Sequence, residues 1–289
     1  MDMARPLDCV YLEITNVCNF SCSFCHKTAR PQRFMSEEEF LLLTERLSGR
    51  ARYLYFHLMG EPTLHPLLPR FITTARDRGF RPILTTNGSL LGKRGEEILA
   101  AAPYKVNISL HAPAANEGFS AVAAYFPDCI SFAKQAAARG ILVGLRLWNL
   151  GSGDDNSGIL TALHTAFPGD WTAARVGESE RLSKSVYLEW GERFVWPDED
   201  GTDAADGEGV FCYALRSHCG VLVDGTVVPC CLDADGVLAL GNLFSEPLDA
   251  ILASPRATAI REGFSRRTAA EPICRTCGFV TRFNKNRKR

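Results

Sequence analysis

Apolar residues in the first two thirds of the chain alternate between two spacings, one typical of buried strands and one typical of amphipathic helices. The capping box Ser36-Glu37-Glu38-Glu39 predicts a helix that begins there and ends near Leu47. Further helices are expected before Gly79 and between 110 and 141. The predicted strands cover 10–15, 53–58, 80–86, 104–110, 141–147 and, more weakly, 171–176.

Strands that alternate with helices predict parallel βαβ units with right-handed crossovers. Six such units are too few for the usual closed eight-fold barrel. The expected fold class is therefore α/β, a partial (β/α)6 TIM-like barrel followed by a small C-terminal α+β iron–sulfur module. A doubly wound sheet is the alternative for the larger part.

Residues of chemical interest follow the ends of the predicted strands. They are Cys18, Gly60, Asn87, His111 and Asn149. Because ligands bind at the carboxyl ends of strands in parallel α/β folds, these positions predict one shared site.

The last third of the chain has a different pattern. Residues 197–209 are acidic and rich in Gly, Asp and Ala, which is typical of a linker. Asp224-Gly225 between two apolar runs predicts a hairpin, and two short helices are expected at 248–253 and 256–263. The expected parts are a barrel at 1–196, the linker at 197–209, an auxiliary-cluster domain at 210–281 and a solvated basic tail at 282–289.

Composition and charge narrow the class of protein. The formal net charge of -1 gives no overall attraction to nucleic acid or to an anionic membrane. Apolar runs are too short for a membrane span, and the N-terminus lacks the pattern of a secretory signal. We therefore expect a cytoplasmic protein. Its 11 cysteines favour metal or redox chemistry, because disulfides rarely persist in the cytoplasm.

Nine of the cysteines fall into two groups, and the other two, Cys9 and Cys129, are expected in the core. In the first group, Cys18, Cys22 and Cys25 are separated by gaps of three and two residues. Such a loop can offer three thiolates to three irons of one cluster and leave the fourth iron free. Zinc is the alternative, but structural zinc takes four ligands, and His26 directly adjoins Cys25.

Three cysteines with this spacing after the first strand, with the aromatic Phe24 before the last of them, resemble the radical S-adenosylmethionine (SAM) superfamily. The resemblance implies a [4Fe–4S] cluster on Cys18, Cys22 and Cys25 whose free iron chelates SAM. It also implies reductive cleavage of SAM to methionine and a 5′-deoxyadenosyl radical that abstracts hydrogen from a substrate. The protein's share is to position these groups and exclude water.

Further positions agree with the resemblance. Met59-Gly60-Glu61-Pro62 looks like the family's Gly-Gly-Glu-Pro motif, with Met59 in place of the first glycine. The motif implies that Gly60 lets the backbone approach SAM and that Glu61 accepts hydrogen bonds from its ammonium group. The remaining SAM-contacting residues that the resemblance implies are Phe24 beside the adenine, Pro62, Asn87, Ser109 and Arg146.

The second cysteine group resembles the auxiliary-cluster domain called SPASM, or twitch in its shorter form. The resemblance implies that one auxiliary [4Fe–4S] cluster binds Cys212, Cys230, Cys274 and Cys277. Either Cys219 or Cys231 is an alternative for the ligand nearby. A zinc ribbon built from the same four cysteines is the alternative for the whole site.

The function implied is radical abstraction of hydrogen from a peptide or small-molecule substrate, with net oxidation or cross-linking and an electron donor such as flavodoxin or ferredoxin. No peptide-recognition domain is expected ahead of the first strand, and no cobalamin domain supports a methyltransferase. His57, His65, His111 and Trp148-Asn149 are weaker candidates for substrate contact. A non-catalytic iron–sulfur or zinc-binding electron-transfer protein is the rival interpretation.

Overall fold

The computed structural model describes residues 6–116, 119, 122–171, 179–197 and 208–284. Within these residues the strands form one ten-stranded sheet in the order β10-β9-β8-β1-β2-β3-β4-β5-β7-β6. The strands are β1 Leu7–Leu12, β2 Ala51–Phe56, β3 Arg81–Thr86, β4 Lys105–Ser109, β5 Leu142–Leu150, β6 Ser179–Arg181, β7 Val186–Glu192, β8 His218–Val221, β9 Thr226–Val228 and β10 Gly241–Asn242. The α-helices are α1 Glu37–Arg46, α2 Leu68–Asp77, α3 Leu91–Ala101, α4 Val122–Ala138, α5 Ser157–Ala166, α6 Leu248–Leu252, α7 Pro255–Ser265, α8 Pro272–Thr276 and α9 Thr281–Asn284. Short 3₁₀ helices are η1 Pro62–Leu64, η2 Pro113–Ala115 and η3 Gly278–Val280.

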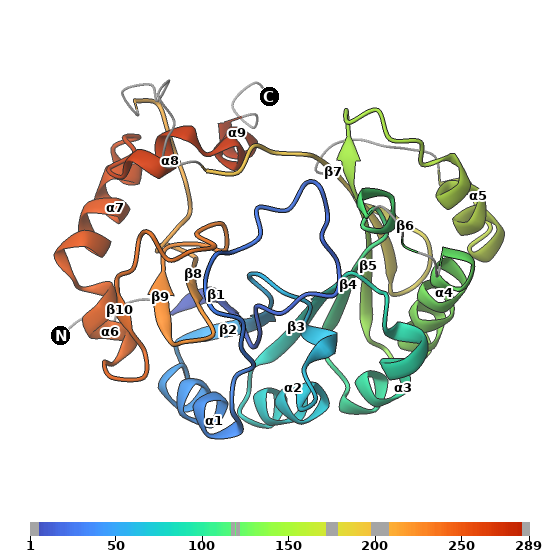
Figure 1. The fold of residues 1–289 in the computed structure, drawn as a ribbon, viewed down its shortest axis with the longest axis horizontal. Helices are drawn as coiled ribbons and strands as arrows, with labels where there is room; N and C mark the ends of the chain where they lie inside the picture. The colour runs from blue at the N-terminus through green and yellow to red at the C-terminus, as the bar shows by residue number, and fades with distance from the viewer. Residues whose placement is uncertain (1–5, 117–118, 120–121, 172–178, 198–207, 285–289) are drawn as a thin grey trace.

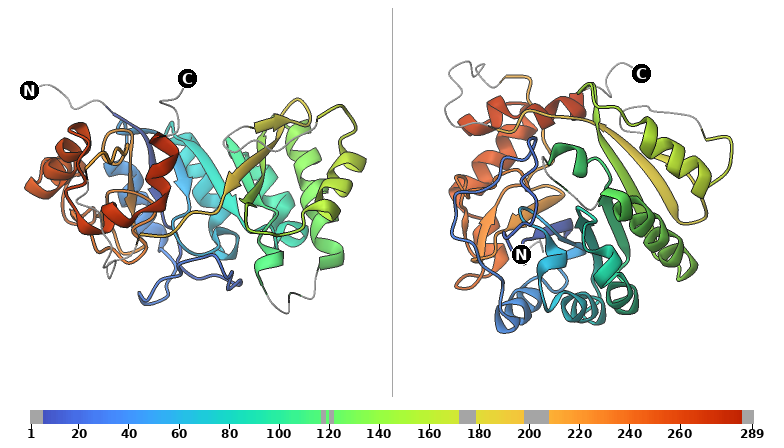
Figure 2. Two further views of the ribbon diagram at one scale, coloured as in Figure 1. Left: turned by 90° about the horizontal axis from the view of Figure 1, so that it is seen from above. Right: turned by 45° about the vertical axis from the view of Figure 1, so that its right-hand side comes forward.

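The strands β1 to β5 and β7 run parallel, each hydrogen-bonded to the next. Helices α1 to α5 lie outside the curved sheet, as Figure 1 and Figure 2 show. The sheet stays open, so the predicted α/β partial barrel is confirmed. The sixth parallel strand is β7, whereas a strand was predicted at 171–176, of which 172–176 lie outside the described residues.

Local sequence explains where the first elements begin and end. Ser36 caps α1 as predicted: its hydroxyl accepts from the Glu39 N–H, and the Glu39 carboxylate accepts from the Ser36 N–H at 2.8 Å. The strand predicted at 10–15 ends earlier, at Leu12. Beyond it, the carbonyl of Ile14 accepts from the Met35 N–H at 2.9 Å, so this segment turns to pair with the chain just before α1.

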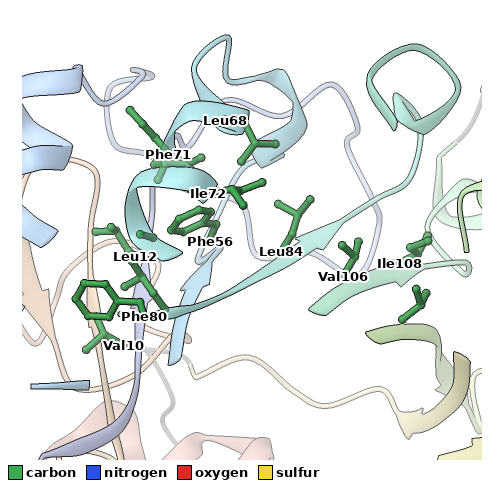
Figure 3. Close-up of a cluster of buried hydrophobic side chains, with 14 of the residues drawn as sticks. Val10, Leu12, Phe56, Leu68, Phe71, Ile72, Phe80, Leu84, Val106 and Ile108 are labelled. Atoms are coloured by element: carbon green, nitrogen blue, oxygen red, sulfur yellow. The ribbon is translucent and has the colours of Figure 1, made fainter. Parts of the chain in front are cut away.

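The core lies between the outer face of the sheet and the helices. Figure 3 shows apolar side chains of successive strands meeting those of α2. Fully or almost fully buried members include Val10, Leu12, Phe56, Phe71, Ile72, Leu84, Val106 and Ile108. Because strand side chains alternate between faces, Tyr11 and Tyr55 point to the inside of the barrel instead.

The C-terminal hairpin continues the barrel sheet. Strands β8 and β9 are antiparallel around Asp224-Gly225, as predicted, and Gly225 has a φ of +83° that favours glycine. Strand β8 also pairs in parallel with β1, with Val10 opposite Cys219. This pairing attaches the last third of the chain to the edge strand of the barrel, β1, next to the loop that follows it.

The expectations for the two isolated cysteines and for the C-terminal tail can be compared with the structure. Cys129 is fully buried as predicted, whereas Cys9 is half-buried. Arg282, the first residue of the expected tail, does not extend into solvent: it donates to the Glu192 carbonyl at 2.7 Å and lies 5.1 Å from the ring centre of Trp148. No helix among the described residues is long and apolar enough to cross a membrane.

Candidate active site

A cavity of about 420 Å³ lies inside the partial barrel. Its size is in the ordinary range for small-molecule sites. Aromatic rings make up much of its wall: Tyr11, Phe24, Tyr55, Trp148, Phe194, Trp196 and Phe279. Polar groups are contributed at the strand ends: His57, Thr85, Ser109, His111, Arg146, Glu192 and Arg193. The cavity is therefore an apolar enclosure with a few placed polar groups.

The first cysteine group lies on the loop after β1, which arches across the middle of Figure 1. The sulfur of Cys18 accepts from the Phe20 N–H at 3.4 Å, and that of Cys22 accepts from Asn116 Nδ2 at 2.9 Å. Burial raises the pKa of Cys22, while the Asn116 hydrogen bond opposes that shift. Such donors favour thiolate, the form that binds iron.

Contacts from two segments in the last third of the chain hold this loop. Trp196 Nε1 donates to the Phe24 carbonyl at 2.9 Å. On the other side, Asp235 accepts from the Thr28 hydroxyl at 2.6 Å and from the Ala29 N–H at 2.9 Å. Sequence reasoning missed these anchors because they join segments that are far apart along the chain.

The residues of the first group fit a three-thiolate cluster. All three lie on one short loop. Burial raises the pKa of Cys18 and of Cys22, and neighbouring thiols of the group add to both shifts. Among the described residues, no three His, Cys, Asp or Glu side chains are grouped as a metal-ion site. In a single-ion site every thiolate lies about 2.3 Å from the same ion, so the thiolates are close to one another. In a cluster each thiolate binds a different iron, so the thiolates lie farther from one another.

The Gly-Glu-Pro loop packs directly beneath the cysteine loop. Gly60 has a φ of +77°, and a Cβ there would lie 2.4 Å from the Thr15 carbonyl oxygen, so only glycine fits. The Glu61 N–H donates to the Val17 carbonyl at 2.8 Å. Pro62 begins the 3₁₀ helix η1.

The buried carboxylate of Glu61 is occupied by donors of the chain itself. Its Oε1 accepts from the hydroxyls of Thr63 at 2.6 Å and Thr86 at 2.7 Å, and from the Thr63 N–H at 3.0 Å. Its Oε2 accepts from the Asn87 N–H at 2.6 Å. Burial raises the pKa of Glu61, and these hydrogen bonds oppose that shift. The Glu61 carboxylate thus joins two segments, the loop after β2 and the end of β3, and its contact with SAM stays a prediction.

The other predicted SAM-site residues divide into two sets. Phe24, Ser109 and Arg146 line the cavity. Asn87 is not among the residues that line it, and its Nδ2 donates to Asn19 Oδ1 at 2.9 Å. Arg146 is paired with Glu189 at 2.9 Å, a residue that sequence reasoning did not single out.

Two histidines differ in how they are held. His111 Nδ1 lies 3.1 Å from the Arg146 carbonyl, and its ring centre is 5.0 Å from that of Phe24. The buried Nδ1 of His57 has no hydrogen-bond partner among the described residues. Burial, with a smaller effect of Arg146, lowers the pKa of His57 to about 3, so the ring is neutral at physiological pH. The third weak candidate, His65, bonds to the Met35 carbonyl away from the cavity.

The second cysteine group surrounds a separate small cavity. Cys212, Cys230, Cys274 and Cys277, the four predicted ligands, all line it. Asp233 also lines it, but its carboxylate caps its own turn, accepting from the N–H groups of Val237 and Leu238 at 2.9 Å each. The four thiols remain as candidates for holding a cluster, and their common enclosure fits one.

The two extra cysteines lie elsewhere. Cys219 is fully buried on β8 and is not among the residues that line this small cavity. Cys231 lines the large cavity instead, beside Tyr11. Burial raises the pKa of Cys231 to about 12, so its thiol is protonated at neutral pH.

The two cavities share a wall. Three pairs of consecutive residues each give one side chain to the large cavity and the next to the small one: Trp196 and Pro197, Cys231 and Cys230, Phe279 and Val280. We call the small cavity lined by Cys212, Cys230, Cys274 and Cys277 the four-thiol cage. Only about one layer of backbone separates it from a group in the large cavity.

Comparisons with known proteins agree with this arrangement. Residues 12–127 match the protein-family model described as the radical SAM superfamily, and residues 212–278 match SPASM, described as an iron–sulfur cluster-binding domain. The chain belongs to the radical SAM superfamily. The radical SAM domain implies a [4Fe–4S] cluster and SAM, and the SPASM domain implies auxiliary iron–sulfur clusters.

Curated relatives of this radical SAM enzyme include two named probable GTP 3′,8-cyclase. One, from Metallosphaera sedula, is 35% identical over 122 residues, covering 37% of this chain and 35% of the relative. Another, from Saccharolobus islandicus, is 32% identical over 111 residues, covering 37% and 36%. The matched segment thus spans about a third of the length of these relatives.

Solved structures share the fold over nearly the whole chain. BtrN in complex with AdoMet and 2-DOIA gives a TM-score of 0.60 at 18% identity, covering 95% of this chain and 94% of that one. Native anSMEcpe with bound AdoMet and Kp18Cys peptide gives a TM-score of 0.62 at 14% identity, covering 90% and 84%.

Proposed function

We propose that this radical SAM enzyme carries out a net two-electron oxidation, or an oxidative cross-link, of a small polar molecule or a single peptide side chain. In this proposal Cys18, Cys22 and Cys25 hold the SAM cluster. Cys212, Cys230, Cys274 and Cys277 hold one auxiliary cluster. When bound, SAM and the clusters supply a radical that removes a hydrogen atom from carbon and an acceptor for the next electron.

The shared wall is the observation that carries the proposal. An oxidation that begins with hydrogen abstraction must next release one electron and one proton from the substrate. The pairs Cys231/Cys230 and Phe279/Val280 put the substrate cavity against the four-thiol cage. The electron therefore has a nearby destination, and an external donor such as flavodoxin or ferredoxin supplies the electron that cleaves SAM.

Four thiols around one cavity also favour a closed cluster. When each iron has its own thiolate, no iron is open to bind substrate. The substrate must then be held by the cavity itself, whose polar groups include the neutral ring of His57 and the Ser109 hydroxyl. An uncharged or zwitterionic substrate suits those groups.

The charges that line the cavity bear on whether its substrate is GTP, the molecule in the name of the curated relatives. A nucleoside triphosphate would need unpaired cations along the wall. The two arginines that line the cavity are both paired, Arg146 with Glu189 at 2.9 Å and Arg193 with Asp154 at 2.8 Å. These pairs support a substrate without phosphate groups, in contrast to GTP.

The test begins with anaerobic purification, reconstitution with iron and sulfide, reduction and addition of SAM. We expect 5′-deoxyadenosine from the wild type and none from the Cys18/Cys22/Cys25 triple Ala variant, with about eight irons per chain falling to about four. Incubations with amino cyclitols and sugars, with short peptides and with GTP are then compared for products two mass units lighter.

Three results would overturn parts of the proposal. Zinc in place of iron, or no deoxyadenosine from the fully loaded protein, would contradict the ligand assignment and leave the electron-transfer alternative. A product of GTP with unchanged mass would replace oxidation by cyclisation. Product formation that persists in Cys274→Ala would separate the oxidation from the auxiliary cluster.

A further inference from the structure

Asn116 contacts the cysteine loop from the segment that follows β4. It directly follows η2, after β4, and its side chain reaches Cys22, 94 residues earlier. Its Nδ2 donates to the Cys22 sulfur at 2.9 Å and to the Ala112 carbonyl at 2.7 Å. Its Oδ1 accepts from the Ser21 N–H at 2.6 Å. One amide group therefore sets both the backbone and the thiol of this part of the loop.

Each of the three thiols has a nearby N–H donor. Cys18 receives one from the Phe20 backbone at 3.4 Å, and a backbone hydrogen bond at Lys27 lowers the pKa of Cys25 against the larger effect of burial. The donor to Cys22 belongs to a side chain. It can be removed by substitution, and Asn116→Asp does so while keeping an acceptor for the Ser21 N–H.

Hydrogen bonds to cysteine sulfurs help to set the potential of an iron–sulfur cluster. An N–H dipole aimed at a thiolate stabilises negative charge, and a reduced cluster carries one more negative charge than an oxidised one. The donor therefore stabilises the reduced form more than the oxidised form. Removing it makes the cluster harder to reduce, and SAM cleavage begins with that reduction.

We propose that Asn116 is a positioning residue that raises the reduction potential of the cluster held by Cys18, Cys22 and Cys25. The inference rests on the ligand set of the proposed function. The Asn116 amide also holds the backbone beside Cys22 through the Ser21 contact, while the Ser23 N–H donates to the Ala115 carbonyl at 3.0 Å. The loop is thus docked at three consecutive residues.

Asn116→Asp tests the proposal most directly. Aspartate keeps the size and the acceptor for the Ser21 N–H, but it replaces the donor to sulfur by a negative charge. Asn116→Ala removes the donor without adding charge. Asn242→Asp is the matched control, because Asn242 also donates to a carbonyl, that of Asp224 at 2.9 Å, and accepts an N–H, that of Phe244 at 2.8 Å, far from the loop.

The readout is an anaerobic redox titration of the reduced-cluster EPR signal that shifts when SAM is added, with iron counted per chain. We expect a more negative midpoint potential in Asn116→Ala, a larger shift in Asn116→Asp, and none in Asn242→Asp. SAM cleavage at fixed reductant should fall by about 10- to 100-fold in the two Asn116 variants. Unchanged midpoint potentials in iron-loaded variants would overturn the proposal, as would loss of the cluster from both, which would leave a fastening role alone.

Cys22→Ala separates this inference from the ligand assignment. If Cys22→Ala keeps a full SAM-responsive cluster, the ligand set of the proposed function is wrong. If Cys22→Ala loses that cluster while both Asn116 variants keep the wild-type potential, the ligand set stands and the role of Asn116 is wrong.

Discussion

The buried carboxylate of Glu13 accepts two hydrogen bonds from the Arg30 guanidinium, both at 2.8 Å. It also accepts from the N–H groups of Met59 and Val223, at 3.1 Å each. Four segments therefore meet at one side chain: the end of β1, the cysteine loop, the Gly-Glu-Pro loop and the C-terminal hairpin. Glu13 therefore connects the two parts of the chain that carry the cysteine groups.

Glu13→Gln should destabilise the fold strongly. The substitution leaves the Arg30 charge, whose side chain is 13% exposed, without its partner. Breaking a buried pair in this way costs about 3–5 kcal/mol, whereas replacing both partners by apolar groups is often much less harmful. We therefore expect Glu13→Gln/Arg30→Met to unfold at higher urea concentration than Glu13→Gln alone. A double variant less stable than either single variant would contradict this account.

Replacing Cys230 and replacing its neighbour Cys231 by Ala should have different effects on the iron content. Cys230→Ala removes a thiol from the four-thiol cage, and we expect the loss of the auxiliary cluster, about four irons per chain. Cys231→Ala changes the wall of the large cavity and should keep the full iron content. Iron analysis with EPR of the reduced proteins distinguishes the two. Equal loss in both variants would show that Cys231 is also needed to bind iron.

The parts of the fold that the sequence predicted depend on short-range rules. The cap of α1 at Ser36 and the Asp224-Gly225 turn need a few adjacent residues. The strand β7 was missed because Glu189, which pairs with Arg146, and Glu192, which lines the cavity, interrupt its apolar run. A strand whose inner face lines a polar cavity does not have the pattern of a buried strand.

The parts of the site that the sequence missed depend on contacts between distant segments. Cysteine spacing singled out both groups, and the structure distinguishes Cys230 from Cys231 by which cavity each lines. Neither the Asn116 contact with Cys22 nor the pairing of β8 with β1 has a local pattern. Such contacts form only when segments far apart in the sequence come together in the fold, and a single sequence carries no spacing rule for them.

Glu61→Gln should reduce both stability and SAM cleavage. The carboxylate accepts three hydrogen bonds on one oxygen and the Asn87 N–H on the other. The single oxygen of glutamine can replace one of these two carboxylate oxygens. Its amide N–H₂ group then stands in place of the other and faces an N–H or O–H donor. Leaving a buried group unsatisfied costs about 1–3 kcal/mol. Urea unfolding gives the first effect, and a deoxyadenosine assay with SAM-binding titration gives the second; a variant with wild-type stability would contradict the four-donor arrangement.

His57 should make the protein less stable as the pH falls. Burial and the nearby Arg146 lower the pKa of His57 to about 3 in the folded chain, whereas an unfolded histidine titrates near 6.5. Between these values the unfolded state binds more protons, so acid favours unfolding, by up to about 1.4 kcal/mol per pH unit from this residue. His57→Gln keeps a polar group in the cavity but removes the titration. The urea midpoint of the variant should therefore decline less than that of the wild type between about pH 6.5 and 5. Parallel decline in the two proteins would mean that the His57 ring takes up a proton in the folded state, as a solvent-accessible imidazole does.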